Sequence, residues 1–353
     1  MNQSLTMHIP DLPDLPRFAN AALAQRVQHR VDRQTKPTGS LGRLEALALQ
    51  IALVQGCERP LLAAPQLVVF AADHGLAAHG VSAYPSDVTA QMVANFLAGG
   101  AAVSVLARQH ALALTVVDCG VRQDFDPQPG LMLKKTARGS ADMLAGPAMT
   151  PTQCLEAIGH GRDVVRALPG NALLLGEMGI GNTSAAALLM HRLAGLPLEQ
   201  CVGRGTGLDD AGLARKWAVL ERVLERHAAV NGPLPVLAAL GGLEIATMVG
   251  ATLQAAAERR VILVDGFICT AAVAVAQALV PGVLAACVFA HCSAESGHAL
   301  WLQQLGVTPL LNLGLRLGEG SGAALAWPLL VSACRLLDEM ASFESAGVSD
   351  RSP

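Results

Sequence analysis

Five segments of the sequence share one order of features: an apolar run, a polar loop with glycine or aspartate, and a helical stretch. The apolar runs are Leu67–Phe70, Ala113–Val117, Ala172–Leu175, Val261–Val264 and Val283–Ala290. They show no alternation of apolar and polar residues, which is typical of strands covered on both faces. Strands that alternate with helices indicate a parallel sheet with right-handed crossovers. We therefore predict an α/β fold, a Rossmann-like parallel β-sheet flanked by helices.

Both ends of the chain lack this strand pattern. Helical patterns run from Arg17 to Arg33, from about Leu41 to Gln55 and from Ser321 to Phe343. A chain of 353 residues commonly forms about two domains. We predict an α/β catalytic domain over residues 61–315, and a small helical subdomain that combines residues 1–60 with residues 316–353.

The composition excludes several classes of protein. Hydrophobic residues make up 52 % of the chain and charged residues 15 %, so the chain can bury a large core and is not intrinsically disordered over most of its length. The formal charge is −3 and aromatic residues are 3 % of the total. A nucleic-acid partner is therefore not expected, because binding needs basic residues for phosphates and aromatic rings for stacking.

Neither a membrane span nor an export signal is evident. The longest stretch without a charged residue, Gly266–Ala294, is mainly Ala and Val and is interrupted by Gln277, Pro281 and His291. The first 18 residues carry acidic residues and prolines where a signal peptide needs a basic start and an apolar run. Eight cysteines without a CxxC pair are typical of reduced, buried thiols. We expect a soluble, cytoplasmic protein outside the membrane.

Two glycine-rich loops precede helices and could hold a phosphate. The first, Gly176–Ser184, joins a predicted strand to a helix that begins near Ala185, and free N–H groups at a helix start attract an anion. It lacks the lysine of a Walker A loop, and Ser184 stands where a dinucleotide fingerprint has its third glycine or alanine. The alternative is a tight turn capped by Thr183 or Ser184.

The second loop, Gly203–Asp210, also precedes a helix. Arg204 could pair with phosphate, while Asp209 and Asp210 suit the N-terminal dipole of that helix. Two such loops in one domain indicate a single phosphate held from two sides. Lys216, further along the helix, could add positive charge, although a solvated helix lysine is the more common case.

Glu319 is the candidate general base. It lies between Gly318 and Gly320, which let the backbone approach a ligand and leave the carboxylate exposed, without neighbouring side chains to shield it. Partial burial would raise its pKa and make it a proton acceptor near neutral pH. The alternative is an ordinary carboxylate in the first turn of a helix. Glu177 is a second candidate, but nothing in the spacing pairs it with Glu319.

A metal site is not expected. His74 and His79 are five residues apart, and His291, Cys292 and His298 form a loose group. Neither set has the spacing of a zinc site.

Six motifs in order give the chain a resemblance to a known family. They are Lys36–Glu45, Ala71–Gly75 with Gly80–Pro85, Gly176–Ser184, Asp265–Ile268, Ser293–His298 and Gly318–Gly322. From about residue 17 to residue 343 the chain resembles the nicotinate-nucleotide–dimethylbenzimidazole phosphoribosyltransferases of cobalamin (vitamin B12) biosynthesis. The resemblance implies a glycosyltransferase that moves the 5-phosphoribosyl group of nicotinate mononucleotide to 5,6-dimethylbenzimidazole. The products would be α-ribazole 5′-phosphate, nicotinate and a proton.

The resemblance also implies roles for individual residues. Glu319 would be the general base, and Glu177 would give electrostatic support to the charge that develops on the ribose. The benzimidazole pocket would contain Ser82, Tyr84, Gln91, Met178 and Leu317. The phosphate and ribose of the nucleotide would be held by Gly179, Gly181, Asn182, Thr183, Gly203, Gly205, Lys216 and Ser293. The enzyme would be a homodimer in which a loop with Lys36 and Ser40 reaches the site of the partner.

This chemistry needs one base and neither a metal nor a cofactor, because nicotinate leaves as a neutral pyridine and no pyrophosphate is released. One alternative is a nucleotide-sensing or NAD-binding protein that uses the same loops without catalysis. A second is a purine-base phosphoribosyltransferase that uses phosphoribosyl pyrophosphate, although such an enzyme normally needs an acidic loop for the metal–phosphate complex.

Overall fold

The computed structural model describes residues 7–9 and 11–349 of the chain. Its centre is a six-stranded sheet in the order β3-β2-β1-β4-β5-β6, in which every pair of neighbouring strands is parallel. The strands are β1 (Gln66–Ala72), β2 (Ala113–Gly120), β3 (Leu131–Leu133), β4 (Ala172–Met178), β5 (Val261–Val264) and β6 (Cys287–Phe289). The predicted α/β fold with a parallel sheet is confirmed.

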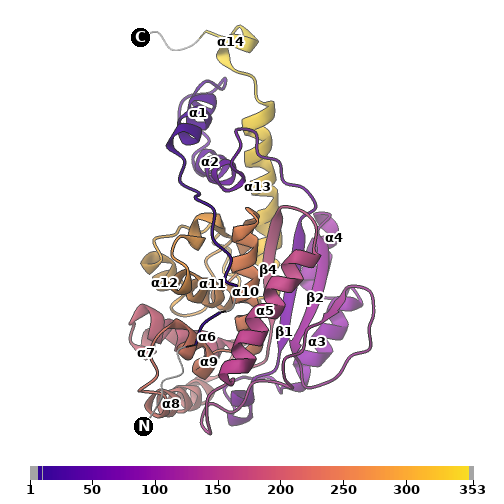
Figure 1. Cartoon of the computed structure of the whole chain (residues 1–353), viewed down its shortest axis with the longest axis vertical. Coiled ribbons are helices and arrows are strands. Elements are labelled where there is room, and N and C mark those ends of the chain that lie inside the picture. The colour runs from indigo at the N-terminus through magenta and orange to yellow at the C-terminus, as the bar shows by residue number, and fades with distance from the viewer. Residues whose placement is uncertain (1–6, 10, 350–353) are drawn as a thin grey trace.

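Helices cover both faces of this sheet (Figure 1). They are α1 (Ala21–Asp32), α2 (Arg43–Gln55), η1 (Gly75–His79), α3 (Asp87–Leu97), α4 (Ala102–Gln109), α5 (Pro151–Ala167), α6 (Asn182–Ala194), α7 (Leu198–Cys201), α8 (Asp210–Arg226), α9 (Pro233–Leu240), α10 (Leu243–Ala257), α11 (Phe267–Leu279), η2 (Val283–Ala286), α12 (His298–Gln304), α13 (Ser321–Glu339) and α14 (Phe343–Ala346). α10 packs on the strands of one face together with α5 and α11, while α3, α4 and α13 cover the other. Because both faces are covered, every residue of β1, β5 and β6 is buried.

The structure differs from the prediction at two strands, β6 and β3. The run Val283–Ala290 was expected to be one strand, but its first four residues form the 3₁₀-helix η2 and only Cys287–Phe289 pairs with β5. Gly282, at φ +103°, turns the chain just before this helix. The edge strand β3 was not predicted, because a three-residue strand that pairs with β2 alone needs no long apolar run.

The terminal helices project beyond the sheet at the top of Figure 1. α13 begins beside β4 and β5 and ends against α2, so it joins this projection to the sheet. α1 begins at Ala21 rather than at Arg17, because Asn20 caps it by accepting the N–H of Leu23 at 3.0 Å. The proposed division into residues 61–315 and a subdomain of both termini remains a prediction, and residues 1–6, 10 and 350–353 of it lie outside the described chain.

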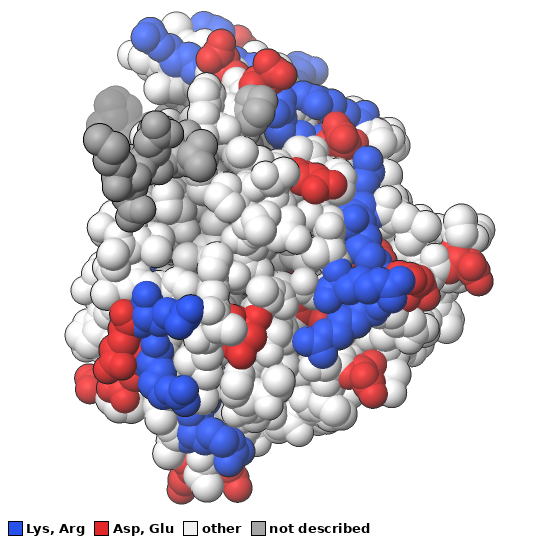
Figure 2. All heavy atoms as spheres, turned by 60° about the horizontal axis from the view of Figure 1, so that its bottom comes forward, with Lys and Arg blue, Asp and Glu red and all other residues white. Residues whose placement is uncertain are grey.

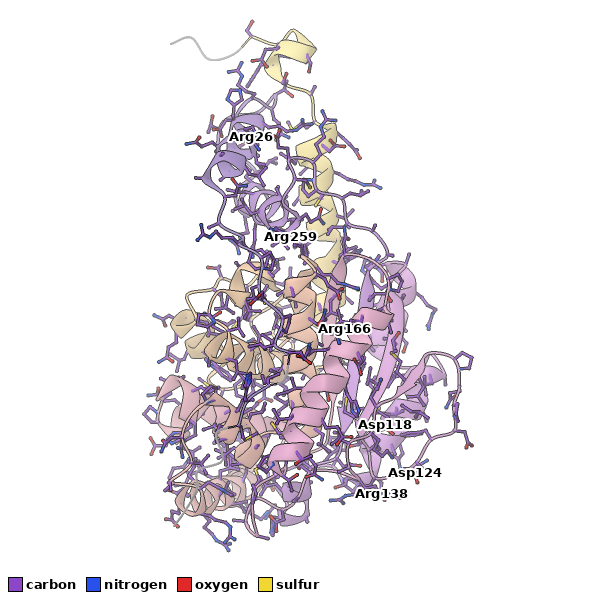
Figure 3. The ribbon with its side chains drawn as sticks, viewed as in Figure 1. Arg26, Asp118, Asp124, Arg138, Arg166 and Arg259 are labelled. Atoms are coloured by element: carbon purple, nitrogen blue, oxygen red, sulfur yellow. The ribbon has the colours of Figure 1, made fainter. Side chains whose placement is uncertain are left out.

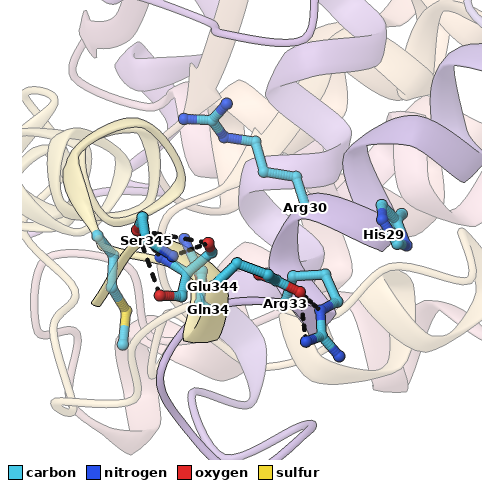
Figure 4. Close-up of a pocket in the computed structure, with 8 residues that line it drawn as sticks. His29, Arg30, Arg33, Gln34, Glu344 and Ser345 are labelled. Atoms are coloured by element: carbon cyan, nitrogen blue, oxygen red, sulfur yellow. Dashed lines mark hydrogen bonds and ion pairs between the residues drawn. The ribbon is translucent and has the colours of Figure 1, made fainter. Parts of the chain in front are cut away.

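A pocket at the tip of the projection lies between α1 and the end of the chain (Figure 4). Arg33 pairs there with Glu344, and Arg30 donates to the carbonyl oxygens of Leu337 and Asp338. The pocket contains none of the predicted site residues. The candidate site is therefore found elsewhere in the molecule.

One helical stretch among the described residues, Asp87–Gln109, is long and apolar enough to cross a membrane by length and composition alone. The structure divides it into α3 and α4, because Gly99 takes φ +80° between them. Two helices of 11 and 8 residues are each shorter than the roughly 20 residues that a membrane span needs.

Two glycines let the backbones of α5 and α10 touch. A Cβ atom on Gly161 would lie 1.8 Å from the carbonyl oxygen of Thr247, and one on Gly250 would lie 1.8 Å from that of Ile158. Gly159, in contrast, faces open space on α5. The contact thus depends on the two glycines that have no room for a side chain.

We expect Gly250→Ala to lower the free energy of unfolding by roughly 1–3 kcal/mol, because the added methyl group must push α5 away from α10. The matched control Gly159→Ala should be neutral or should stabilise the protein by up to about 1 kcal/mol. Urea unfolding of both variants measures the difference. Equal effects of the two substitutions would contradict this account of the helix contact.

Candidate active site

The candidate site lies at the carboxyl ends of the strands, next to the point where the strand order reverses between β1 and β4. Figure 3 shows this end of the sheet through Asp118, in the last part of β2, with Asp124 and Arg138 nearby. Ligands of doubly wound sheets bind at such switch points. A hollow of about 550 Å³, partly open to solvent, is lined here by Glu177, Met178, Gly179, Ile180, Asn182, Thr183, Gly205, Thr206, Gly266, Phe267, Ile268, His291, Ser293, Glu295, Arg316, Leu317 and Gly318.

The fold brings the two candidate carboxylates together, although 142 positions separate Glu177 from Glu319 in the sequence. Glu177 is the second-last residue of β4, and a Cβ atom on Gly318 would lie 2.3 Å from its Oε1 atom. Glu319 is the residue after Gly318. Only 5 % of its surface is exposed, so the prediction that its carboxylate is exposed is wrong. Its Oε2 atom accepts the N–H of Val103 at 3.5 Å. The alternative of a first-turn helix carboxylate is also wrong, because Glu319 precedes the N-cap Gly320.

The backbone at Glu319 is held in a left-handed conformation. Its φ angle is +65°, between φ +81° at Gly318 and φ +91° at Gly320, and a non-glycine residue there costs about 1–2 kcal/mol. Gly176 of β4 allows the close packing, since a Cβ atom on it would lie 2.4 Å from the carbonyl oxygen of Glu319. Such backbone strain persists where the surroundings determine the conformation, and it gathers at functional sites.

Both carboxyl groups titrate near neutral pH. Burial raises the pKa of Glu319 to about 7, and the charge of Asp265 adds to the shift while the N–H of Val103 opposes it. Burial raises the pKa of Glu177 to about 8, with Asp265, Glu244 and Glu319 adding to it. The side chain of Asn182 donates a hydrogen bond to Glu177 and opposes the shift. The site can therefore accept a proton under physiological conditions.

Asp265 connects three parts of the site. It follows β5 and accepts the N–H groups of Gly320 at 3.2 Å and Ala323 at 3.0 Å, and so caps α13, whose own N-cap is a glycine. His291 lies on its other side, with Nε2 at 3.5 Å from Oδ1 of Asp265. Burial lowers the pKa of His291, but the hydrogen bond and the charge of Asp265 outweigh burial and raise it.

The first glycine loop leads into α6 without a side-chain cap. The N-cap is Gly181 at φ +98°, and neither Thr183 nor Ser184 caps the helix, so the alternative of a capped turn is wrong. Thr183 instead accepts a hydrogen bond from the ammonium group of Lys216 at 3.0 Å. The N–H groups of Asn182 and Ser184 donate to the carbonyl oxygens of Gly179 and Gly181 at 3.1 and 3.0 Å, which leaves the N–H of Thr183 at the start of α6 for a ligand.

Lys216 is fully buried, so the alternative of a solvated lysine is wrong. Its ammonium group also donates to the carbonyl oxygen of Gly203 at 3.0 Å, and it thereby ties the second glycine loop to the first. Burial lowers the pKa of Lys216 to about 8, while the charge of Glu295 opposes the shift. Lys216 lies behind the lining residues Thr183 and Gly205.

In the second glycine loop, Arg204 was expected to face a phosphate, but it bonds within its own loop. Arg204 pairs with Asp210 and donates to the carbonyl oxygen of Leu208, whereas Asp209 caps α8 by accepting the N–H of Gly212 at 2.7 Å. Arg316 is the arginine that lines the pocket, and it donates to the carbonyl oxygen of Gly205 at 3.3 Å. The sequence interpretation missed Arg316, although its position two residues before Gly318 was a usable signal.

Other lining residues were also not proposed. From the sequence, His291 was considered only as a possible metal ligand. Ile268 and Glu295 lie within motifs of the family resemblance, but neither was predicted to be a site residue. Among residues 7–9 and 11–349, no three His, Cys, Asp or Glu side chains are arranged to hold a metal ion. On the face shown in Figure 2, Lys and Arg side chains form separate stripes beside uncharged surface rather than one continuous basic patch.

The residues predicted for the benzimidazole lie in two places. Met178 and Leu317 line the pocket. Ser82, Tyr84 and Gln91 do not line it, but the hydroxyl of Ser82 lies 3.4 Å from that of the lining residue Thr206. The segment between η1 and α3 therefore borders the hollow, and Tyr84 is 52 % exposed there.

Lys36 and Ser40 lie in the helical projection and not in the pocket of the same chain. The ammonium group of Lys36 is buried and lies 2.8 Å from Oε1 of Glu45. Burial raises the pKa of Glu45, but the bonds from Lys36 and the N–H of Leu41 outweigh burial and lower it. Ser40 is exposed.

The chain is similar to known proteins over nearly its whole length. A family model described as "Phosphoribosyltransferase" (DBI_PRT) matches residues 17–348. A nicotinate-nucleotide–dimethylbenzimidazole phosphoribosyltransferase of Variovorax paradoxus (strain S110) is 69 % identical over 96 % of this chain and 97 % of its own length. The protein of that name from Cupriavidus necator is 60 % identical over 94 % and 97 %. A crystal structure of CobT from Thermus thermophilus matches with a TM-score of 0.90 and 44 % identity over 93 % of this chain and 99 % of that one.

The burial of Glu177 makes stability depend on pH. Because its folded pKa of about 8 lies above the ordinary value of 4.5, the protonated form stabilises the fold, and this contribution is lost as pH rises from 4.5 through 8. We expect the free energy of unfolding of the wild type to fall over this range relative to Glu177→Gln, measured by urea unfolding. Glu45→Gln is a control of opposite sign, since the lowered pKa of Glu45 gives stability that is lost as pH falls. A wild-type-to-Glu177→Gln difference that does not change with pH would contradict the raised pKa.

Proposed function

The chain belongs to the nicotinate-nucleotide–dimethylbenzimidazole phosphoribosyltransferase family, and we propose that it transfers the 5-phosphoribosyl group of nicotinate mononucleotide to 5,6-dimethylbenzimidazole. The products are α-ribazole 5′-phosphate, nicotinate and a proton. The observation that carries the proposal is the pair of buried carboxyl groups, Glu177 and Glu319, that share one end of the sheet with two glycine loops joined by a buried lysine.

The chemistry of the two bases determines what the site must supply. The ring nitrogen of nicotinate is cationic while it is bonded to C1′ of the ribose, so nicotinate leaves as a neutral pyridine without a general acid. One nitrogen of the benzimidazole forms the new bond to C1′, and the other loses its proton. The reaction therefore needs one base and an environment that tolerates positive charge on the ribose.

We assign the base to Glu319. A group that accepts a proton during catalysis works best with a pKa near the working pH, and burial raises the pKa of Glu319 to about 7. The backbone of Glu319 is left-handed and packs against Gly176, and the next residue, Gly320, donates its N–H to Asp265. These contacts restrict where the carboxylate of Glu319 can lie. Positional restraint of this kind keeps a base at a fixed distance from its substrate.

Glu177 supports the charge on the ribose in this proposal. With its pKa raised to about 8, Glu177 holds a proton at neutral pH until a cation enters the site. The cationic nicotinate ring favours the ionised carboxylate, and an oxocarbenium-like ribose would be stabilised by the same charge. Asn182 orients the side chain by donating to it.

The phosphate of the nucleotide belongs at the glycine loops. The first turn of α6 supplies the N–H group of Thr183, since that of Asn182 donates to the carbonyl oxygen of Gly179. Lys216 lies behind Thr183 and Gly203. A helix start with a buried cation behind it favours an anion. Gly179, Gly205 and Ser293 line the same volume, and Gly181 contributes as the N-cap of α6. In this proposal the benzimidazole occupies the side bordered by Met178, Leu317 and the segment with Ser82, Tyr84 and Gln91.

We further propose that the enzyme is a cytoplasmic homodimer. All eight cysteines lie in the described residues and none forms a disulfide, as expected in a reducing compartment. The helical projection keeps Lys36 and Ser40 away from the pocket of their own chain. A second copy of the chain can bring that loop to the pocket, and the symmetry of a dimer would place two such loops over two sites.

Glu319→Gln should lower kcat by roughly 10²–10⁴-fold, the usual effect of losing a positioned base. The amide keeps the shape of the side chain, so the affinity for nicotinate mononucleotide should change little. Release of nicotinate measures turnover, and calorimetry measures binding. Turnover close to that of the wild type at saturating substrates would rule out Glu319 as the base.

Mixing two inactive variants tests the dimer and its loop. One carries substitutions at Lys36 and Ser40, and the other carries Glu319→Gln. If the loop acts in the partner's site, a heterodimer has one site with both lesions and one site with neither. Activity should then rise to about a quarter of the wild type after subunit exchange, because half of the dimers are mixed. No recovery after demonstrated exchange would place the loop in its own chain's site.

A further inference from the structure

His298 lies directly behind the wall of the pocket. It begins α12 and is fully buried, although it follows the pocket-lining residues Ser293 and Glu295 closely in the sequence. Its ring packs edge-on against Phe267, another lining residue, with the ring centroids 6.1 Å apart. His298 is therefore part of the support of the site without lining it.

The hydrogen bonds of His298 determine its tautomer. The backbone N–H of Ser293 donates to Nδ1 at 2.8 Å, so Nδ1 carries no proton and Nε2 carries one. Nε2 lies 2.9 Å from the hydroxyl oxygen of Thr270, and that hydroxyl donates its own proton to the carbonyl oxygen of Gly266 at 2.8 Å. Thr270 must then accept from Nε2. A directed chain of three hydrogen bonds runs from Ser293 to Gly266.

This chain joins two separate parts of the pocket. Ser293 belongs to the loop after β6, and Gly266 is the N-cap of α11 after β5. Both residues line the hollow. Neither ring nitrogen of His298 is free, so the loose group of His291, Cys292 and His298 cannot offer this histidine to a metal without breaking the chain.

We propose that His298 is a positioning residue, which in its neutral Nε2–H form holds the Ser293 loop against the start of α11 and so shapes the subsite for the phosphoribosyl group. The inference rests on the proposed function, because that function assigns the nucleotide to Ser293. It gives His298 no contact with the substrate.

The surroundings of His298 favour this one form of the ring. Burial lowers the pKa of His298 to about 3, and the neighbouring His291 adds to this shift. An imidazolium would have a donor on both nitrogens and could not accept the N–H of Ser293.

Gly297 sets the point at which α12 begins. It takes φ +81°, and it leaves room for the carbonyl oxygen of Gln200, which would lie 2.4 Å from a Cβ atom at this position.

Four variants test the role of the chain. His298→Phe keeps the ring contact with Phe267 but removes both hydrogen bonds, whereas His298→Asn keeps an oxygen that can accept the N–H of Ser293. Thr270→Val removes the hydroxyl, and Thr270→Ser keeps it. The matched control is His227→Gln, because His227 is also a buried histidine with a hydrogen bond to the backbone, in its case to the carbonyl oxygen of Met143, and is not a pocket residue.

We expect His298→Phe to raise KM for nicotinate mononucleotide by about 5- to 100-fold, the range that follows from an unsatisfied buried group. KM for dimethylbenzimidazole should stay within about 3-fold of the wild type. The reason is that Ser293 and Gly266, the two pocket-lining residues in this chain of bonds, are not among the residues assigned to the dimethylbenzimidazole subsite. Thr270→Ser should keep most of the wild-type affinity. His298→Asn and Thr270→Val should each have a KM between those of the wild type and His298→Phe, because both keep an acceptor for the N–H of Ser293 but break the bond between positions 298 and 270. His227→Gln should leave both KM values unchanged.

A purely structural role would have a different result. Loss of folded protein in His298→Phe would lower kcat with both KM values unchanged, and this outcome overturns the proposal. Nitrogen-15 chemical shifts of the His298 ring in the wild type supply a measurement that needs no variant: Nδ1 must be unprotonated and Nε2 protonated at pH 7. The opposite tautomer, or an imidazolium, also overturns it. If the wild type forms no α-ribazole 5′-phosphate, the proposed function fails, while the ring shifts still decide the tautomer.

Discussion

The close approach of the Gly318–Gly320 backbone to β4 is the contact on which the rest of the site depends. Gly176 leaves room for the carbonyl oxygen of Glu319, and Gly318 leaves room for the carboxylate of Glu177. Side chains at these two glycines would push the segment away from the sheet. With them absent, the start of α13 lies on the strand ends, and two carboxyl groups far apart in the sequence share one low-dielectric environment.

That environment then determines the charge state of the whole site. The charge of Asp265 adds to the raised pKa values of both Glu177 and Glu319, and Glu319 adds to that of Glu177, so these two carboxyl groups hold protons near neutral pH. The ammonium group of Lys216 lies buried behind the glycine loops, and Asp265 raises the pKa of His291. A site with excess carboxyl groups and an anion-binding helix start is suited to a substrate that is cationic at its ring and anionic at its phosphate. Nicotinate mononucleotide has this distribution of charge.

Much of the fold and part of the site follow from local sequence patterns. The continuous apolar runs predicted the central strands, because burial on both faces leaves no position for a polar residue. The Gly–Glu–Gly pattern indicated Glu319, because glycines on both sides let the backbone approach a ligand. Lys216 could not be interpreted in this way, since a lysine in a helix looks the same whether it is solvated or buried. Its burial depends on Thr183 and Gly203, which approach it from other elements.

The sequence by itself determined that polar loops follow apolar strands, and therefore that the chemistry gathers at one edge of a parallel sheet. It also carried the motifs by which the family resemblance was found. Only the tertiary structure decided which loops meet. The order β1-β4-β5 places Glu177 and Asp265 on neighbouring strand ends, and α13 returns across them with Glu319. The pKa values and the direction of the His298 hydrogen bonds arise from these meetings, because desolvation and donor–acceptor pairing depend on distances in space and not on spacing along the chain.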